Sequence, residues 1–231
     1  MLQKYRSILL TRPIEASRRM KNDLLSINNK LDILISPLIE IQYTAYDFIK
    51  RDYSAYIVTS ENAINSLMSN KVSLGEIDVF CVGQQTQRLA IKAGYNVLGT
   101  YPRVELLVKD LSELKFKDKL FYFRGDHVSC DLKPTLGNKG IEIEEMIVYN
   151  QQACSLSKEA FNLLASKPCL IPLFSARTAK LFSKEVATLS SKVHLIYCMS
   201  ENIKKKVALD WNCKVAPIGI NAANMADICR L

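Results

Sequence analysis

Residues 55–67 place a short strand, two hydroxyl residues and a helix directly after one another. The apolar run Tyr56-Ile57-Val58 is typical of a buried strand, and the apolar spacing then becomes helical at Ala63, Ile64 and Leu67. Ser60 lies at this change and is a suitable N-cap, so the backbone N–H groups behind it form a weak anion site. The same order recurs at 79–94, 120–126, 170–182 and 193–207. These repeated units predict an α/β fold with parallel sheets, because successive parallel strands need a crossover connection.

The remaining elements follow from apolar periodicity and from turn residues. Strands are expected at 7–11, 31–35, 56–58, 77–82, 95–98, 119–123, 141–149, 169–174, 193–198 and 213–216. Helices are expected at 13–25, shortly after Ala45, and at 60–67, 84–93, 104–114, 131–139, 158–165, 177–186, 201–209 and 222–229. Two stretches have the character of connectors, an alternating extended one at 38–43 and a polar one at 150–157.

The number of strands in each part of the chain predicts a discontinuous domain. The segment before residue 37 has only two expected strands, too few for an independent parallel sheet, so it needs the C-terminal strands. We therefore expect two similar α/β domains with parallel sheets, one from 1–36 plus 154–231 and the other from 45–145. Residues 37–44 and 146–153 would join them as a two-stranded β linker. Ser60 and Gly83 are spaced much as Ser175 and Ser200 are, which suggests a duplicated unit.

Charge and residue usage restrict the classes of partner. The formal net charge is +8, which favours an acidic partner, although its densest run, 204–206, is also explained as a solvated helix face. The seven cysteines contain no Cys-x-x-Cys pair and indicate reduced thiols, and the two histidines lack metal-ligand spacing. No apolar run is long enough to span a membrane or to act as a secretory signal, so we expect a cytoplasmic protein.

Standard cofactor and hydrolase motifs are missing from the sequence. The segment Val82-Gly83-Gln84-Gln85-Thr86 has a single glycine, so it is neither a dinucleotide fingerprint nor a phosphate-binding P-loop. No Gly-x-Ser-x-Gly elbow is present, which disfavours a serine hydrolase. We expect no cofactor and no metal.

Small or hydroxyl residues instead follow several of the expected strands. They are Thr11, Thr59, Ser60, Gly83, Thr86, Gly125, Ser175 and Ser200. Each alone is well explained as a helix cap. Together, with Arg12 and Arg124 adding charge-assisted hydrogen bonds, they would suit a cleft between the domains that binds a substrate with several carboxylates.

Several short motifs occur in the order and spacing of the uroporphyrinogen-III synthase family. They are Ile8-Leu9-Leu10-Thr11-Arg12-Pro13, Pro37-Leu38-Ile39-Glu40-Ile41, Val58-Thr59-Ser60-Glu61-Asn62-Ala63-Ile64, Val82-Gly83-Gln84-Gln85-Thr86 with Gly94, Phe123-Arg124-Gly125 followed by Gly140 and Val148-Tyr149, and Phe174-Ser175. The chain therefore resembles a bacterial-type member of this family over nearly its whole length.

The resemblance implies a cofactor-independent lyase of tetrapyrrole (haem) biosynthesis. Such an enzyme cyclises hydroxymethylbilane to uroporphyrinogen III with inversion of ring D and loss of water. The resemblance also implies that Tyr149 is the weak general acid, with aromatic packing as the alternative role for this residue. Thr59, Ser60, Gly83 and Thr86 would bind substrate carboxylates, with Ser175 as a further candidate. The expected partner is this polycarboxylate tetrapyrrole, bound by a monomer, with no nucleic acid and no membrane.

The sequence departs from the family pattern at two places. Ser200 and Ile203 stand where a second Gly-x-x-Thr turn is expected, and Val128-Ser129 replaces a frequent Gly-Arg. Two alternatives remain open: a non-enzymatic two-domain protein that binds an acidic metabolite or nucleic acid, and a nucleotide-dependent enzyme. The first lacks interleaved aromatic and basic residues, and the second lacks a glycine-rich loop.

Overall fold

The computed structural model describes residues 5–189, 193–216 and 220–229. The chain forms two compact units, the first from Met1–Glu40 with Gln152–Leu231 and the second from Ile41–Gln151. We call them unit 1 and unit 2. No helix within the described ranges is long and apolar enough to cross a membrane, and no group of three or more potential ligand side chains there could hold a metal ion.

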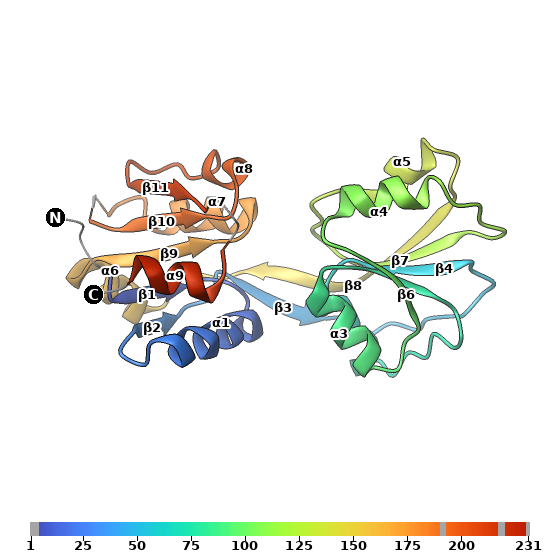
Figure 1. The fold of residues 1–231 in the computed structure, drawn as a ribbon, viewed down its shortest axis with the longest axis horizontal. Coiled ribbons are helices and arrows are strands. Elements are labelled where there is room, and N and C mark those ends of the chain that lie inside the picture. Colours follow the sequence, from blue (N-terminus) through green and yellow to red (C-terminus); the bar gives the residue numbers. More distant parts are fainter. Residues whose placement is uncertain (1–4, 190–192, 217–219, 230–231) are drawn as a thin grey trace. The chain divides into compact units, whose positions relative to one another are not determined.

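Unit 1 contains a five-stranded parallel sheet in the order β11-β10-β9-β1-β2 (Figure 1). The strands are β1 (Ser7–Leu10), β2 (Asp32–Ile35), β9 (Cys169–Leu173), β10 (Leu195–Cys198) and β11 (Asn212–Val215). Side chains alternate between the two faces of a strand, so Ile8 and Leu10 pack on one face of β1 and Leu9 on the other.

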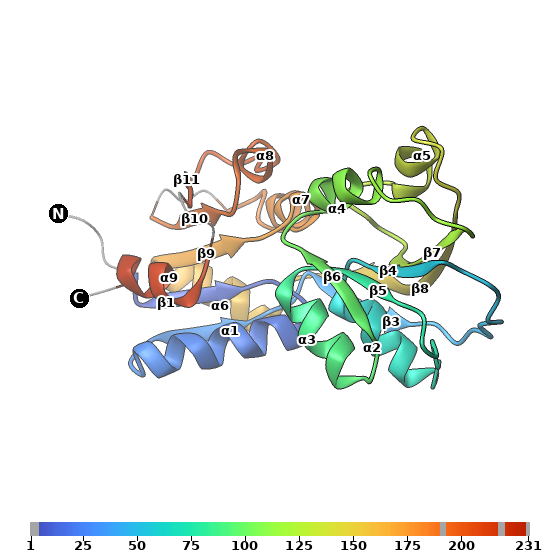
Figure 2. The same cartoon turned by 45° about the vertical axis from the view of Figure 1, so that its right-hand side comes forward.

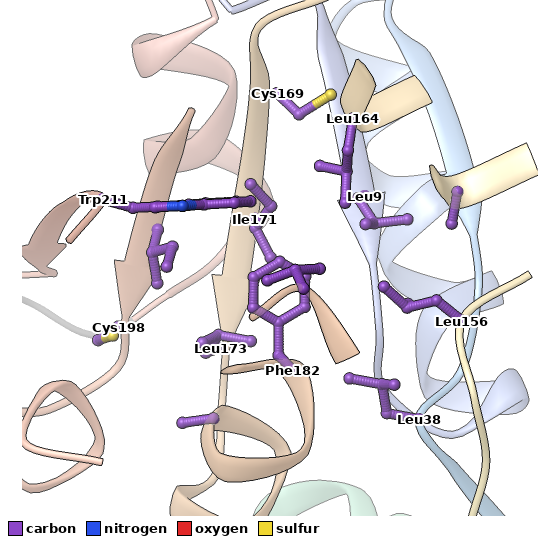
Figure 3. Packing of buried hydrophobic residues seen from close by; sticks show 14 of the residues in the cluster. Leu9, Leu38, Leu156, Leu164, Cys169, Ile171, Leu173, Phe182, Cys198 and Trp211 are labelled. Carbon is purple, nitrogen blue, oxygen red and sulfur yellow. The ribbon is translucent and has the colours of Figure 1, made fainter. Parts of the chain in front are cut away.

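Helices cover both faces of the unit 1 sheet. Ile8 and Leu10 face α1 (Ile14–Ile27) and α9 (Ala222–Ile228), whereas Leu9 faces α6 (Lys158–Ser166), α7 (Ala176–Glu185) and α8 (Glu201–Lys204). Between the sheet and the helices α6, α7 and α8, the side chains of Leu9, Ile171 and Phe182 converge from β1, β9 and α7 (Figure 3). This packing explains why the N-terminal strands need the C-terminal ones.

A six-stranded sheet in the order β3-β8-β7-β4-β5-β6 belongs to unit 2, except for one end of β3 and one end of β8, which belong to unit 1 (Figure 2). Its strands are β3 (Ile39–Tyr43), β4 (Ala55–Val58), β5 (Val79–Val82), β6 (Val97–Tyr101), β7 (Leu120–Gly125) and β8 (Ile143–Ala153). One face packs against α2 (Glu61–Ser69) and α3 (Gln84–Lys92), and the other against α4 (Val104–Leu111) and α5 (Leu132–Gly137).

The chain passes between the units within β3 and β8. The Thr44 N–H donates to the Val148 carbonyl at 3.5 Å, and the Cys154 N–H donates to the Leu38 carbonyl at 3.0 Å. From Leu38 to Thr44 the residue number rises, while that of the hydrogen-bonded partner falls from Cys154 to Val148, so the two segments run antiparallel. The function of 37–44 and 146–153 as a linker, and the domain limits expected from the sequence, stay predictions.

The two sheets share one spatial strand order. When β9, β10, β11, β1 and β2 are matched to β4, β5, β6, β7 and β8, the five strands stand in the same order in both sheets, and β3 lies beside β8 as a sixth strand. The predicted fold class of two similar parallel-sheet α/β domains is therefore confirmed. Ser175 after β9 and Ser60 after β4 occupy equivalent turns.

The short helix expected after Ala45 is wrong, because residues 44–53 form neither a helix nor a strand. The ring of Phe48 instead packs edge-on against Tyr56, Phe121 and Phe123, with centroids 5.0–6.0 Å apart. Aromatic pairs in this geometry add to the energy of apolar burial. Packing against the sheet thus determines the path of this segment.

Two element ends also differ from expectation. The helix expected at 201–209 ends at Lys204, because the Ala208 N–H donates to the Ser183 hydroxyl at 3.0 Å and the chain turns toward the core. Of the three consecutive lysines only Lys204 is helical, and all three are exposed. Strand β8 continues beyond Tyr149 to Ala153, into the stretch expected to be a connector.

Candidate functional site

Ligands of doubly wound sheets gather at the carboxyl ends of strands, where the strand order reverses. In unit 2 the reversal lies between β4 and β7, and in unit 1 between β1 and β9. Thr59 and Ser60 follow β4, and Arg124 and Gly125 end β7. Thr11 follows β1 and Ser175 follows Phe174 after β9. The topology therefore brings these residues to the reversal point of each unit, whereas Gly83 and Thr86 follow the next strand, β5, and Ser200 follows β10.

The turn after β4 is ordered by two hydroxyl contacts. Ser60 caps α2, and its Oγ accepts a hydrogen bond from the Asn62 N–H at 3.2 Å. Thr59 Oγ1 lies 2.7 Å from the hydroxyl of Tyr122, which is 2% exposed and belongs to the adjacent strand β7. Both predicted hydroxyls are thus held in place while remaining partly exposed.

Tyr149 lies beside Gly125 in the neighbouring strand. A Cβ built on Gly125 would come within 2.5 Å of the Tyr149 ring and 2.8 Å of its hydroxyl, so only glycine leaves room for this ring. Burial raises the pKa of Tyr149, and a neighbouring Asp126 carboxylate raises it further, while contacts with Ser60 and Asn62 oppose the change. The phenol therefore keeps its proton at neutral pH.

Arg124 is engaged within unit 2. Its Nη2 lies 2.8 Å from Glu145 Oε1 and its Nη1 donates to the Gly125 carbonyl at 3.0 Å. Both side chains are mostly buried, at 17% and 19% exposed. A direct bond between this guanidinium and a substrate would compete with Glu145.

Gly83 and Thr86 begin the next helix, α3. Gly83 has φ of +86°, a conformation that favours glycine, and its N–H donates to the Tyr101 carbonyl at 2.8 Å. Thr86 is 4% exposed and lies in the first turn. The N-terminus of α3 thus points out of the same edge of the sheet as that of α2.

Unit 1 presents Arg12 at its reversal point. The Arg12 guanidinium carbon lies 4.2 Å from the centroid of the Phe174 ring, a cation–π distance. Thr11 is completely buried, and its hydroxyl has no hydrogen-bond partner. Arg12 is therefore the better-placed residue of this pair for contact with a ligand.

Ser175 and Ser200 are both N-caps. Ser175 Oγ accepts from the Thr178 N–H at 3.1 Å and lies 2.8 Å from the Thr178 hydroxyl. Ser200 Oγ accepts from the Ile203 N–H at 3.4 Å, at the start of a helix of four residues. Ser200 has φ of −156°, unlike its counterpart Gly83, and Ile203 is buried where Thr86 has a hydroxyl. The turn at Ser200 therefore caps its helix with a backbone geometry that differs from that of the turn at Gly83.

Sequence reasoning missed three residues of the unit 2 site: Asn62, Tyr122 and Glu145. Tyr122 carries a hydroxyl in an otherwise apolar run two residues before Arg124, so strand alternation places the two on one face. This signal identifies Tyr122. The partner of Arg124 had no such signal, because it depends on the register between β7 and β8.

A depression of about 840 Å³ lies at the opposite edge of the unit 2 sheet. Its lining includes Tyr53 before β4, Lys119 before β7, and Glu144 near the start of β8. Tyr53 donates a hydrogen bond to Glu144 at 2.8 Å. Burial is the larger cause and this contact the second cause that raise the pKa of Tyr53 to about 12. The depression contains none of the predicted site residues.

These features define a class of protein. The chain is a two-domain α/β protein whose candidate ligand groups are hydroxyls, helix N-termini and a buried tyrosine at the carboxyl ends of parallel strands. A sequence model of the family described as uroporphyrinogen-III synthase HemD matches residues 25–226. The chain belongs to the uroporphyrinogen-III synthase family.

Solved structures agree on the fold. A uroporphyrinogen-III synthetase from Helicobacter pylori is 18% identical, with a TM-score of 0.63 over 86% of this chain and 93% of that chain. A mutant uroporphyrinogen III synthase from Thermus thermophilus is 10% identical, with a TM-score of 0.55 over 96% and 98%. No curated protein sequence matches the chain.

The match to the family model confirms the resemblance expected from the sequence, and with it the predicted enzymatic function in tetrapyrrole biosynthesis. The alternative of a non-enzymatic binding protein gains no support from these matches.

Proposed function

We propose that this chain cyclises hydroxymethylbilane to uroporphyrinogen III, with inversion of ring D, and that Tyr149 is its general acid. The observation that carries the proposal is the position of Tyr149. This residue is 5% exposed, and its side chain fills the space left by Gly125 and lies beside the capped N-terminus of α2.

The chemistry assigned to Tyr149 is protonation of the departing hydroxyl. The C–O bond breaks, water leaves, and the substrate becomes an azafulvene. The substituted carbon of ring D attacks it to give a spiro intermediate, which fragments and closes again with ring D inverted. The substrate releases one proton as its pyrrole ring becomes aromatic again, and this proton returns to the Tyr149 phenolate. All electrons of these steps stay within the substrate, so the reaction as written needs no cofactor.

A phenol suits this acid role because it is protonated at neutral pH. The burial that raises the pKa of Tyr149 also makes it a weaker acid, so its contribution depends on hydrogen bonding to the hydroxyl as charge develops. General acid catalysis contributes roughly 10²–10⁴-fold. We assign the remainder of the acceleration to positioning of the flexible tetrapyrrole.

Substrate carboxylates are assigned to the helix N-termini. In unit 2 these are the start of α2 with Thr59 and Ser60, and the start of α3 with Gly83 and Thr86. Each helix N-terminus contributes about 0.3–1 kcal/mol toward binding an anion. Several such contacts to acetate and propionate groups would fix one substrate conformation.

In unit 1 the proposed contacts are Arg12, Ser175 and the Ser200 hydroxyl. We assign Arg124 an indirect role, since its ion pair with Glu145 holds the end of β7 next to Gly125. We further propose that the enzyme acts as a monomer in the cytoplasm and has no nucleic-acid or membrane partner.

The test is the rate of uroporphyrinogen III formation by wild-type protein and by Tyr149→Phe. The variant should be roughly 10²-fold slower, because it loses the acidic hydroxyl and keeps the ring. Tyr56→Phe is the matched control, because the Tyr56 hydroxyl is buried in the same sheet without a partner. Equal rates for Tyr149→Phe and wild type would reassign Tyr149 to packing.

A further inference from the structure

Two cysteine sulfurs touch in unit 1, outside the residues assigned to the reaction. Cys198 is the last residue of β10 and Cys213 lies in the adjacent edge strand β11. Their Sγ atoms are 3.6 Å apart. Both side chains face the layer of the core that contains Trp211 and Ile203 (Figure 3 labels Cys198 and Trp211). The pair is therefore a dithiol in van der Waals contact.

The two thiols differ in accessibility. Cys198 is completely buried, whereas Cys213 is partly exposed because β11 has a neighbour on one side only. A reagent in solvent reaches Cys213 first, and Cys198 can then react with whatever forms on Cys213.

The thiols also differ in acidity. The pKa of Cys213 is lowered, chiefly by the contact between its sulfur and the Cys198 thiol. The same contact, together with burial, raises the pKa of Cys198. Lys204 of α8 favours the thiolate at both positions and Glu201 opposes it. The exposed sulfur is thus also the one that ionises more readily, and the thiolate is the nucleophile.

We propose that Cys198 and Cys213 form a peroxide-reactive dithiol that closes to an intramolecular disulfide. The Cys213 thiolate attacks one oxygen of a hydroperoxide, the O–O bond breaks, and Cys213 becomes a sulfenic acid while the peroxide leaves as an alcohol or as water. The Cys198 sulfur then attacks the Cys213 sulfur, and water leaves as the S–S bond forms. The two thiols lose two electrons and two protons in total, which reduce one peroxide.

The register of the strands limits the stability of this disulfide. Cys213 pairs with Ile196, and Cys198 pairs with Val215, so the two cysteines are offset diagonally. A disulfide needs the sulfurs about 2.05 Å apart, so the edge strand has to shift for the bond to close. Strained disulfides are reduced more easily, so the bond should be reversible by a thiol reductant.

The experiment treats the reduced full-length chain with one equivalent of hydrogen peroxide and maps its peptides by mass spectrometry without reduction. A cross-link between the Cys198 and Cys213 peptides is expected, and dithiothreitol should remove it. Cys198→Ser should stop at a sulfenic acid on Cys213 that dimedone captures, whereas Cys213→Ser should leave Cys198 unlabelled.

Cys130 and Cys154 serve as internal controls, because they are partly exposed like Cys213. Cys213 should be oxidised several-fold faster than either, because it alone of the three has a second thiol within 3.6 Å that converts its sulfenic acid into a disulfide. The proposal is overturned if no Cys198–Cys213 cross-link forms, or if Cys130 or Cys154 is oxidised at the same rate as Cys213. The result does not depend on the reaction assigned to the enzyme.

Discussion

At the scale of single residues, three of the predicted site hydroxyls act as helix caps in the protein. Ser60, Ser175 and Ser200 each accept a hydrogen bond from a helix N–H. Capping leaves the neighbouring N–H groups of the helix directed outward, so it is compatible with binding of an anion. Capping residues could be predicted from the sequence because N-caps have a strong local preference. The contact between Tyr122 and Thr59 could not, because it joins residues on separate strands.

Tyr122→Phe tests the role of this contact. The bond of 2.7 Å between the Tyr122 hydroxyl and Thr59 Oγ1 fixes the orientation of the Thr59 side chain, so Tyr122 positions Thr59. Removing the bond should raise KM for hydroxymethylbilane about fivefold, corresponding to about 1 kcal/mol, and leave kcat nearly unchanged. Steady-state kinetics of Tyr122→Phe and of Thr59→Val, each compared with wild type, measure these changes in KM and kcat. A loss of thermal stability with unchanged KM would make Tyr122 a purely structural residue.

Gly125→Ala tests whether space for the Tyr149 ring matters. The added methyl would lie within 3 Å of three ring or hydroxyl atoms of Tyr149, so the ring must move. We expect at least a tenfold loss of kcat, since small displacements of a catalytic group are costly. Gly137→Ala is the matched control, because a Cβ there meets nothing within 4 Å. Equal activity of the two variants would contradict the proposed placement of the phenol.

At the scale of elements, local periodicity predicted the strands well and the connecting segments poorly. The apolar runs of β4, β7 and β9 are buried along their whole length or nearly so, which gives them a strong signal. Residues 44–53 and the end of α8 instead depend on contacts with distant parts of the chain. Tertiary contacts of this kind override local propensity, and a single sequence does not display them.

Phe48→Ala tests the segment that replaces the expected helix. Phe48 contacts three aromatic rings of β4 and β7, so its removal should lower the free energy of unfolding of unit 2 by about 2–3 kcal/mol. The neighbouring Ile49 is 72% exposed, and Ile49→Ala should change this free energy by less than about 0.5 kcal/mol. Urea denaturation of both variants, followed by far-UV circular dichroism, would show the difference. Equal stabilities would mean that Phe48 does not hold the segment.

At the scale of the whole molecule, the matched strand orders account for the discontinuous chain. Unit 1 uses the same five-strand arrangement as unit 2, but its first two strands come from the start of the chain. Counting strands in the sequence predicts a discontinuous domain, because two strands are too few for an independent parallel sheet. The partners of Arg124 and Thr59 needed the sheet register as well.

The stability of unit 1 should depend on pH through His194. This side chain is completely buried, its Nδ1 accepts from the Cys169 N–H at 3.2 Å, and its Nε2 has no partner. Burial lowers its pKa below the usual 6.5, so below pH 6.5 the unfolded chain binds a proton that the folded chain does not. Stability is therefore full above pH 6.5 and falls as the pH drops toward the lowered folded pKa, by at most about 1.4 kcal/mol per pH unit.

Urea unfolding between pH 7.5 and 5.5 measures this dependence. The fluorescence of the single tryptophan reports on unit 1, since Trp211 lies 4.7 Å from His194 between ring centroids. His194→Asn should flatten the pH dependence, whereas His127→Asn should leave it unchanged because His127 is exposed. A wild-type midpoint that is constant over this range would contradict the burial argument.

The proposed function requires that this chain direct ring closure toward the inverted isomer. The most direct measurement supplies the wild-type protein with freshly prepared hydroxymethylbilane and separates the oxidised products by isomer. Closure without an enzyme gives uroporphyrinogen I, so we expect mostly the III isomer, formed at a rate proportional to protein concentration. Formation of the I isomer alone, at the rate seen without protein, would contradict it.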